Sequence, residues 1–388
     1  MKNFKILYCI GSLSTPGGTE RVLSSKASIF ADKHNIEVHI ATISTDTSRF
    51  YEFSSNIKFH NLSYAYKDKS YLKIPLFRNF CIKRDLYGEY EGLIREIAPN
   101  IVIVLERGTD DFYIPSICHK LKVPVAREFH FAKAAVFSRA QIMDSALTRM
   151  RYLLNYGRIF RAFNNYDYML LLTEKDQMEG GYKTETVVIP NIVPPLVSEE
   201  SLADVKNNRT FISVGSMNDR RKGFDSIIKA WAVISNKYPE WTFEIWGDGQ
   251  YASSLRMLID DLGVNDSVKL CGTTNNIAEK LQKSAFYVSG AVAEGLPMVL
   301  IEAMSCGLPC VAYDCPTGPS DIITDGKDGI LVPLNDTMSL KDAIEREINN
   351  VELRLKQAKC AREKSMQYTE EVIIPQWLRF FTKFGYQG

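Results

Sequence analysis

The sequence predicts an α/β protein with two domains, each built around a parallel β-sheet. Short apolar runs typical of buried strands alternate with longer segments of helical periodicity along the chain. Strands that are separated by helices pair in parallel, with helices on both faces of the sheet. Two successive sets of strands therefore indicate two domains. The predicted strands are residues 5–10, 36–43, 101–106, 124–127 and 168–172 in the first set, and 210–214, 242–246, 268–271, 285–289 and 309–313 in the second.

Length and composition agree with this fold class. A chain of 388 residues is long enough for two domains with full cores, and 45% hydrophobic with 24% charged residues is typical of a soluble globular protein. No run approaches the roughly 20 apolar residues that span a bilayer, and residues 1–10 read as a first strand rather than a signal peptide. The eight cysteines include no Cys-x-x-Cys pair, which favours reduced thiols. We therefore expect a cytoplasmic protein.

The boundary between the two domains is predicted after residue 190. A proline-rich apolar run at 187–195 is followed by a polar segment at 198–209, which is typical of a strand end and a linker. We therefore assign residues 1–190 to an N-terminal domain and residues 191–367 to a C-terminal domain. The remaining residues, 368–388, form a helical segment rich in aromatic side chains.

Two glutamates that lie eight residues apart, Glu294 and Glu302, mark the most informative stretch of the chain. Glu294 is predicted on the loop after the strand at 285–289, and Glu302 about one turn inside the next helix. Ligands of doubly wound sheets bind at the carboxyl ends of the strands, where a helix N-terminus favours an anion or a polyol. A solvated surface is the alternative for two glutamates at this spacing. The same loop contains Gly295, Leu296 and Pro297.

A second candidate segment follows the first predicted strand. Gly17 and Gly18 open the next helix, and glycine lets the backbone approach a phosphate or a sugar closely. Their spacing is not that of the dinucleotide-binding fingerprint, which disfavours an NAD oxidoreductase. A plain turn between strand and helix is the alternative for this segment.

A basic loop follows the strand at 210–214. Cations on a loop at the carboxyl end of a strand can bind an anionic ligand. The alternative is a solvated basic turn. The residues of interest in this loop are Gly215, Ser216, Arg220, Arg221 and Lys222.

Further residues follow strand ends in the same way. His130 lies just beyond a predicted strand of the first set, and Gly247 and Gly272 follow two strands of the second. Glycine at a strand tip admits close approach of a ligand. A lone histidine at such a place also fits a structural role.

The stretch around Glu294 and Glu302 resembles the Glu-x7-Glu motif of retaining glycosyltransferases of the two-Rossmann (GT-B) architecture, particularly glycosyltransferase family 4. In that family the first glutamate lies against the donor sugar, and the second holds the ribose hydroxyls of the nucleotide. The segment with Gly17 and Gly18 resembles the family's Gly-Gly-x-Glu-Arg segment, which faces the donor diphosphate. The resemblance extends over nearly the whole chain and is strongest over residues 214–333.

The basic loop resembles the family's Gly-Arg-Leu-x-x-x-Lys-Gly-x-Asp segment, with one departure. Ser216 stands at the usual arginine position and the loop is one residue longer. Lys222 therefore matches the family's lysine, and either Arg220 or Arg221 would replace the missing arginine. In this family a histidine at the position of His130 lies against the donor sugar and the reacting centre.

The resemblance implies a retaining GT-B glycosyltransferase of the bacterial surface-polysaccharide type. It would move a hexose or N-acetylhexosamine from a nucleotide diphosphate sugar, taken as UDP-linked, to a hydroxyl of a glycan or lipid-linked glycan, as in lipopolysaccharide or capsule synthesis. No obligatory metal or other cofactor is expected, and residues 368–388 would cross back to the N-terminal domain. The implied catalytic residues are His130, Glu294, Lys222 and Arg221, and the implied donor-binding residues are Gly17, Gly18, Gly215, Ser216, Arg220, Gly247, Gly272, Gly295, Leu296, Pro297 and Glu302.

Two alternatives stay open. One is a GT-B epimerase that acts on a UDP-sugar. The other is a catalytically silent module that binds a sugar nucleotide or a glycan. Two departures from the family pattern would allow it: Ser216 at the usual arginine position, and Asp321 where a glutamate is usual. Glu106 and Arg107, after another predicted strand, would either contact the acceptor or form a salt bridge.

Two stretches of the N-terminal half are strongly basic, although the net charge of the chain is only +1. Residues 63–84 and 129–166 each carry six Lys or Arg against one acid, with aromatic and aliphatic residues between them. Such stretches favour docking on an anionic membrane surface, here the inner face of the cell membrane, and the rest of the chain disfavours nucleic acid. The alternative is a solvated basic face over aromatic core residues. The cations are Lys67, Lys69, Lys73, Arg78, Lys83 and Arg84 in the first stretch, and Lys133, Arg139, Arg149, Arg151, Arg158 and Arg161 in the second.

Overall fold

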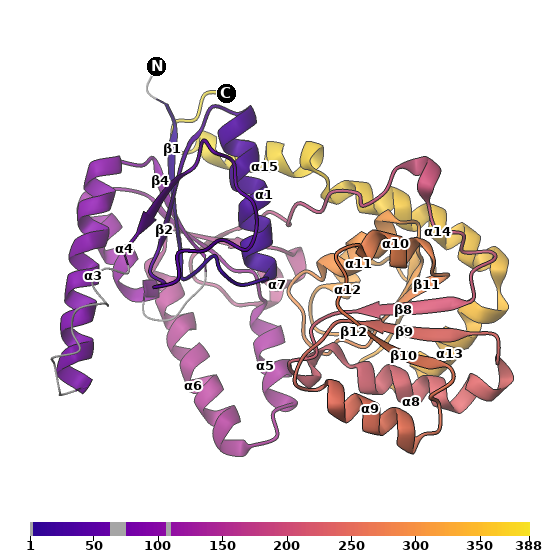
Figure 1. Ribbon diagram of the computed structural model, residues 1–388. Helices are drawn as coiled ribbons and strands as arrows, with labels where there is room; N and C mark the ends of the chain where they lie inside the picture. The colour runs from indigo at the N-terminus through magenta and orange to yellow at the C-terminus, as the bar shows by residue number, and fades with distance from the viewer. Residues whose placement is uncertain (1–2, 63–74, 106–109) are drawn as a thin grey trace.

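The computed structural model describes residues 3–62, 75–105 and 110–388, and it forms two α/β domains that lie side by side (Figure 1). For residues 75–83 and 110–112 only the backbone is described. Each domain contains one parallel sheet between helices, as the alternation of strand-like and helical segments predicts.

The N-terminal sheet has seven strands in the order β3-β2-β1-β4-β5-β6-β7, and all its pairs are parallel. The order reverses between β1 and β4, which is where doubly wound sheets open a crevice for a ligand. The strands are β1 Lys5–Ile10, β2 Glu37–Thr42, β3 Lys58–Asn61, β4 Ile101–Leu105, β5 Val125–Glu128, β6 Tyr168–Leu171 and β7 Glu185–Val188. The helices are α1 Gly18–Lys33, α3 Pro75–Ile97, α4 Asp110–Leu121, α5 Lys133–Gln141, α6 Ala146–Ala162 and α7 Glu174–Glu179.

The C-terminal sheet has six parallel strands in the order β10-β9-β8-β11-β12-β13. Its order reverses between β8 and β11. The strands are β8 Thr210–Val214, β9 Thr242–Trp246, β10 Val268–Gly272, β11 Phe286–Ser289, β12 Cys310–Asp314 and β13 Gly329–Pro333. The helices are α8 Phe224–Ile234, α9 Ala252–Asp261, α10 Ile277–Gln282, α11 Met298–Ser305, α12 Pro319–Ile322, α13 Thr337–Asn349, α14 Val351–Ser365 and α15 Glu370–Thr382.

All ten predicted strands are present; three further strands were not among them, namely β3, β13 and β7, of which β7 was recognised only as a strand end before the linker. Each of the three lies at an edge of its sheet. An edge strand pairs on one side only, so it needs fewer apolar residues; β3 and β7 have no buried residue. β13 is short and begins with glycine and ends with proline, which masks its strand pattern.

The last helix, α15, packs against the N-terminal domain although it follows the C-terminal domain in the chain. Figure 1 shows α15 beside α1. Trp377 and Phe381 contact Phe30 of α1, with ring centroids 6.0 and 5.3 Å apart, and they belong to the core that includes β1. The domain limits at residues 190 and 367 remain predictions.

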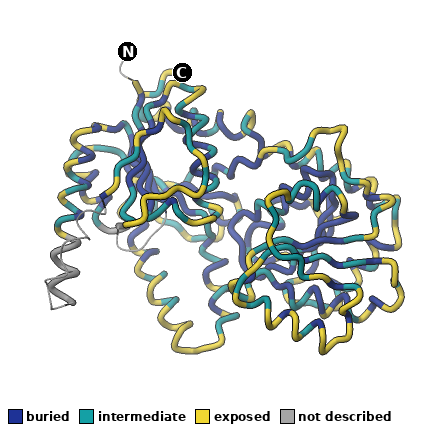
Figure 2. The backbone as a smooth tube through the Cα atoms, in the orientation of Figure 1, coloured by how far each residue is buried: buried dark blue, intermediate teal, exposed yellow. Residues whose placement is uncertain are grey.

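The interior of each domain is the sheet, and the α5–α6 hairpin projects from the N-terminal domain. Figure 2 shows buried residues in the middle of both domains and exposed residues at the tip of this hairpin. Within the described parts of the chain, no helix is both long and apolar enough to cross a membrane.

Candidate active site

A cavity of about 320 Å³ lies between the two domains. Its walls include Val214 and Ser289 at the carboxyl ends of β8 and β11, so it opens where the order of the C-terminal sheet reverses. The N-terminal domain contributes the start of α1 and the residues that follow β5. Seven of the predicted site residues line this cavity: Gly18, His130, Arg221, Lys222, Glu294, Leu296 and Pro297.

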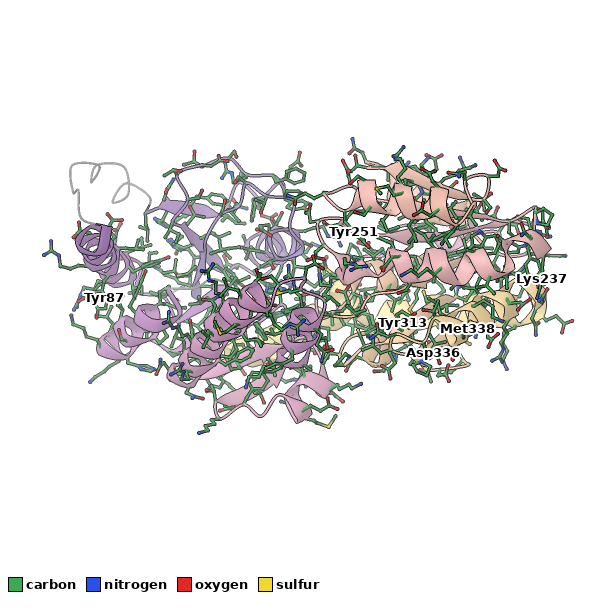
Figure 3. The ribbon with its side chains drawn as sticks, turned by 90° about the horizontal axis from the view of Figure 1, so that it is seen from below. Tyr87, Lys237, Tyr251, Tyr313, Asp336 and Met338 are labelled. Atoms are coloured by element: carbon green, nitrogen blue, oxygen red, sulfur yellow. The ribbon has the colours of Figure 1, made fainter. Side chains whose placement is uncertain are left out.

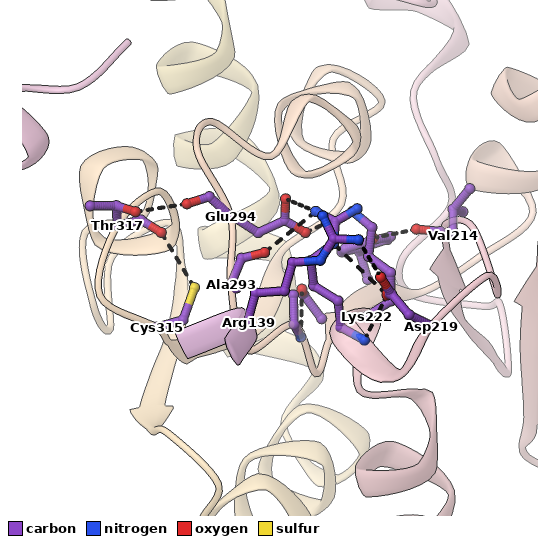
Figure 4. A network of polar contacts seen from close by, with 12 residues as sticks. Arg139, Val214, Asp219, Lys222, Ala293, Glu294, Cys315 and Thr317 are labelled. Carbon is purple, nitrogen blue, oxygen red and sulfur yellow. Dashed lines mark hydrogen bonds and ion pairs between the residues drawn. The ribbon is translucent and has the colours of Figure 1, made fainter. Parts of the chain in front are cut away.

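Glu294 holds two cations at the wall of the cavity. It is 6% exposed, Lys222 donates from Nζ to Oε1 at 2.7 Å, and Arg221 Nη1 lies 3.5 Å from Oε2. Burial would raise the pKa of Glu294, but Lys222 and Arg221 outweigh it and lower the pKa below the usual range. The hydroxyl of Thr317 donates to the main-chain carbonyl of Glu294 at 2.7 Å (Figure 4). The carboxylate is therefore ionised and both its oxygens face cations.

The structure distinguishes the two neighbouring arginines of the basic loop. Arg221 lines the cavity, whereas Arg220 donates from Nε to the hydroxyl of Tyr251 at 3.1 Å and lies 3.5 Å from Asp225. Asp219 caps the short turn by accepting from the main-chain nitrogen of Arg221 at 3.0 Å. The turn therefore directs Arg221, and not Arg220, toward Glu294.

A larger cavity of about 860 Å³ adjoins the first and shares Arg139 with it. It is lined by Arg220 and Tyr251, and Figure 3 shows Tyr251 at the end of the C-terminal domain that faces the N-terminal domain. Arg139 Nη2 lies 2.9 Å from Asp219 and so joins the two domains between the cavities (Figure 4). We assign the site to the smaller cavity, because it lies at the strand ends and contains Glu294.

Glu302 is paired across the domain boundary. It lies on α11, is 4% exposed, and accepts from Nη2 of Arg21 on α1 at 2.5 Å. Arg21 ends the segment that resembles the family's Gly-Gly-x-Glu-Arg, but its pairing with Glu302 could not be predicted, because no local pattern joins two residues 281 positions apart. The carboxylate expected to hold ribose hydroxyls is thus already held by a cation of the opposite domain.

Close backbone approach explains Gly295, and the end of the Met298 side chain lies close to Gly18. A Cβ on Gly295 would lie 2.5 Å from the carbonyl oxygen of His130, so only glycine lets this loop rest on the N-terminal domain. A Cβ on Gly18 would lie 3.2 Å from Met298 at the start of α11. The two domains are therefore in direct contact at the cavity.

The other predicted donor-binding residues do not line the cavity. Gly247 donates to the carbonyl of Gly272 at 2.8 Å, and Gly215 packs against the side chain of Lys222, all at the carboxyl edge of β8, β9 and β10. Ser216 is exposed, and its hydroxyl accepts from the main-chain nitrogen of Asn218 at 3.3 Å. Gly17 lies against the carboxylate of Glu20.

The second basic stretch, residues 129–166, is only partly a surface feature. Lys133 donates to the carbonyl of Gly180 at 2.7 Å, and Arg139 pairs with Asp219, so both are partly buried and paired within the protein. Phe163 is buried and Phe160 packs against the same core cluster. These residues therefore do not belong to one fully exposed basic face, and docking of the stretch on a membrane remains a prediction. Most of the first stretch, residues 63–83, and Glu106 and Arg107 lie outside the described side chains.

No group of three or more His, Cys, Asp or Glu side chains that could hold a metal ion occurs in the described parts of the chain. The expectation that no metal is obligatory remains a prediction.

Two Rossmann-like domains with a cavity between the carboxyl edges of their parallel sheets define the GT-B class of proteins. Residues 198–364, which include most of the C-terminal domain, match the model of the family Glycosyl transferases group 1. The resemblance inferred from the motifs is confirmed for the fold and the family.

Relatives and solved structures match over almost the full chain. The chain is 27% identical over 379 residues to an uncharacterized glycosyltransferase of Haemophilus influenzae, covering 96% of this chain and 98% of the relative. The lipopolysaccharide outer core galactosyltransferase WaaB has a similar fold, with a TM-score of 0.75, 19% identity and coverage of 98% and 100% of the two chains. The Anabaena protein HepE in complex with UDP has a TM-score of 0.73, 17% identity and coverage of 98% and 100%.

Proposed function

We propose that this protein is a retaining glycosyltransferase that moves a hexose or N-acetylhexosamine from a UDP-sugar to a hydroxyl of a cell-surface glycan or its lipid-linked precursor. The observation that carries the proposal is the buried Glu294, which holds Lys222 and Arg221 at a cavity closed by the N-terminal domain. The similarity in fold to HepE, which was solved in complex with UDP, supports a UDP-linked donor. The similarity in fold to the lipopolysaccharide outer core galactosyltransferase WaaB supports a cell-surface glycan as the acceptor.

In this proposal the two cations stabilise the leaving diphosphate. Lys222 and Arg221 stay beside Glu294 and turn their remaining N–H groups to the diphosphate oxygens, where charge develops as the bond from the sugar C1 to the phosphate oxygen breaks. Glu302 accepts hydrogen bonds from the ribose hydroxyls. Arg21 then leaves Glu302 and contacts the donor. His130 lies against the donor sugar.

Both carboxylate oxygens of Glu294 face cations, so we do not assign it as a nucleophile. The acceptor oxygen instead forms the new bond to C1 on the face that the diphosphate leaves. The hydroxyl proton passes to the leaving phosphate oxygen. Attack on that face retains the configuration of the sugar.

A UDP-release assay with and without acceptor tests the proposal. Purified protein should release UDP from one member of a panel of UDP-sugars only when a suitable glycan or lipid diphosphate-linked acceptor is present. Mass spectrometry should then find the acceptor heavier by one sugar, and NMR should find the anomeric configuration of the donor retained. Release of UDP with an epimerised free sugar would instead identify an epimerase, and no turnover over the whole panel would favour a silent binding module.

We further propose that α6 docks the enzyme on an anionic membrane surface, where a lipid-linked acceptor would be met. α6 contains no Asp or Glu, and one exposed face combines apolar and basic side chains. Basic residues bind anionic lipid, and apolar residues between them allow shallow burial. The apolar residues, each more than half exposed, are Leu147, Met150 and Leu154, and the exposed cations are Arg149, Arg151, Arg158 and Arg161.

Replacing Arg151, Arg158 and Arg161 by glutamine should weaken binding to phosphatidylglycerol vesicles by roughly 100-fold at low salt, because each cation near an anionic surface contributes about 1 kcal/mol. Co-sedimentation across salt concentrations measures this loss. The matched control replaces three exposed lysines of the C-terminal domain by glutamine, Lys327, Lys356 and Lys359.

The control triple variant should bind vesicles as the parent does. Met150→Ser with Leu154→Ser should also weaken binding without changing its dependence on salt. Equal losses for the two charge triples, or no binding of the parent at low salt, would contradict docking through α6.

A further inference from the structure

A buried ion pair lies behind His130, outside the walls of the cavity. Glu128 is the last residue of β5 and Lys26 lies in the middle of α1; they are 2% and 1% exposed. Lys26 donates from Nζ to Oε1 of Glu128 at 2.5 Å. The sequence offers no sign of this pair, because its members are 102 residues apart.

Pairing favours the charged form of both groups, although burial lowers the pKa of Lys26. Burial would raise the pKa of Glu128, but Lys26 and His130 lower it to about 2. The ammonium of Lys26 lies 4.1 Å from the ring centroid of Trp377 on α15, which favours the charged form. Burying two charges costs desolvation free energy, which their mutual attraction often does not recover. Such a pair is therefore weak evidence for a role in stability alone.

The same carboxylate oxygen reaches the histidine. Oε1 of Glu128 lies 3.0 Å from Nε2 of His130, although the two are not aligned as a hydrogen bond. The second oxygen of Glu128 has no hydrogen-bond partner among the described residues. An ionised carboxylate beside one imidazole nitrogen favours the hydrogen on that nitrogen and leaves the other as an acceptor.

We propose that Glu128 is a positioning residue, which fixes His130 as the tautomer with its hydrogen on Nε2, and that Lys26 holds Glu128 in place. His130 then offers Nδ1 as an acceptor to a hydroxyl of the donor sugar in the cavity. This last step rests on the proposed function, whereas the tautomer does not. Through Trp377 the arrangement also connects the terminal helix α15 with the cavity.

Nitrogen-15 NMR of labelled histidine tests the tautomer without any activity assay. At pH 8 the parent should show His130 protonated on Nε2, with the signal identified by its loss in His130→Asn. In the double variant Lys26→Met with Glu128→Leu, which leaves no unpaired buried charge, the Nδ1-protonated form should appear in the His130 signal. An unchanged signal in the double variant, or a parent protonated on Nδ1, would overturn the proposal.

A matched control replaces a more exposed ion pair that joins α1 to α15, Lys33 and Glu370, by methionine and glutamine. This control should leave the His130 signal as in the parent. If the buried double variant fails to fold, Glu128→Asp keeps the charge and withdraws it from the ring. The Glu128→Asp variant should also show the Nδ1-protonated form of His130. A spectrum without that form would equally overturn the proposal.

Kinetics provide the second readout. The buried double variant should lose roughly tenfold in kcat, the scale of one hydrogen bond to substrate, with UDP affinity within about twofold of the parent. A fall in UDP affinity equal to the fall in kcat would indicate a merely structural role. If the parent shows no turnover with any donor, the proposed function fails while the NMR result still decides the tautomer.

Discussion

Replacing Lys222 by alanine should reduce turnover by roughly 100-fold or more, the usual scale for losing one group that stabilises developing charge. Lys222 is the closest cation to Glu294 at the cavity, at 2.7 Å, and its ammonium is positioned to reach a leaving diphosphate. The measurement is kcat for UDP release with the acceptor present. Circular dichroism of the variant confirms that it folds.

Arg220→Ala is the matched control for Lys222→Ala. Arg220 belongs to the same turn but contacts Tyr251 and Asp225 outside the cavity, so its loss should change kcat by less than about threefold. Arg221→Ala should resemble Lys222→Ala more than Arg220→Ala, since Arg221 lines the cavity. Equal and mild effects of all three substitutions on kcat would indicate that this loop is a solvated turn with no role in catalysis.

Replacing Glu302 by alanine should weaken UDP binding by about 1–3 kcal/mol, because the ribose hydroxyls lose their acceptor and remain partly unpaired. Titration calorimetry measures the loss. The parent should also bind UDP more tightly than a dideoxy analogue that lacks both ribose hydroxyls, and Glu302→Ala should not discriminate between the two. Discrimination that survives in the variant would exclude the ribose assignment.

Because Glu302 contacts Arg21, the effect of Glu302→Ala on UDP binding must also be measured in a variant that lacks Arg21. Removal of Glu302 also frees Arg21, which would then approach the diphosphate and offset part of the loss. Comparing Glu302→Ala in the parent and in Arg21→Ala separates the two effects as a double-mutant cycle. A loss that disappears entirely in the Arg21→Ala background would mean that Glu302 acts only by holding Arg21.

The fold class could be predicted from the sequence because it depends on local periodicity. Buried parallel strands are short apolar runs, and ten of them are visible in the chain without any knowledge of their partners. The edge strand β3 was missed and β7 was recognised only as a strand end, because both pair on one side and bury no residue. β13 is obscured by the glycine and the proline at its ends.

The loops of the candidate site could be located for the same reason. Glu294 and Lys222 each follow an apolar run and precede a helix, which predicts a position at the carboxyl edge of a sheet. That edge is where the structure has them, on two loops 72 residues apart that meet in one ion pair. Glycines at the cavity are visible in the sequence, but the carbonyl of His130 that makes Gly295 necessary is not.

The sequence by itself determined the alternation of strands and helices, the two sheets and the loops that carry charged residues, because each of these follows from the order of neighbouring residues. Only the tertiary structure decided which charges meet. Arg220 and Arg221 are adjacent and chemically identical. The turn that Asp219 caps directs the side chain of Arg220 to the larger cavity and that of Arg221 to the smaller one. The pairs of Arg21 with Glu302 and of Lys26 with Glu128 likewise depend on distance in space, since a charge interacts with whatever the packing of helix on sheet brings within a few ångströms.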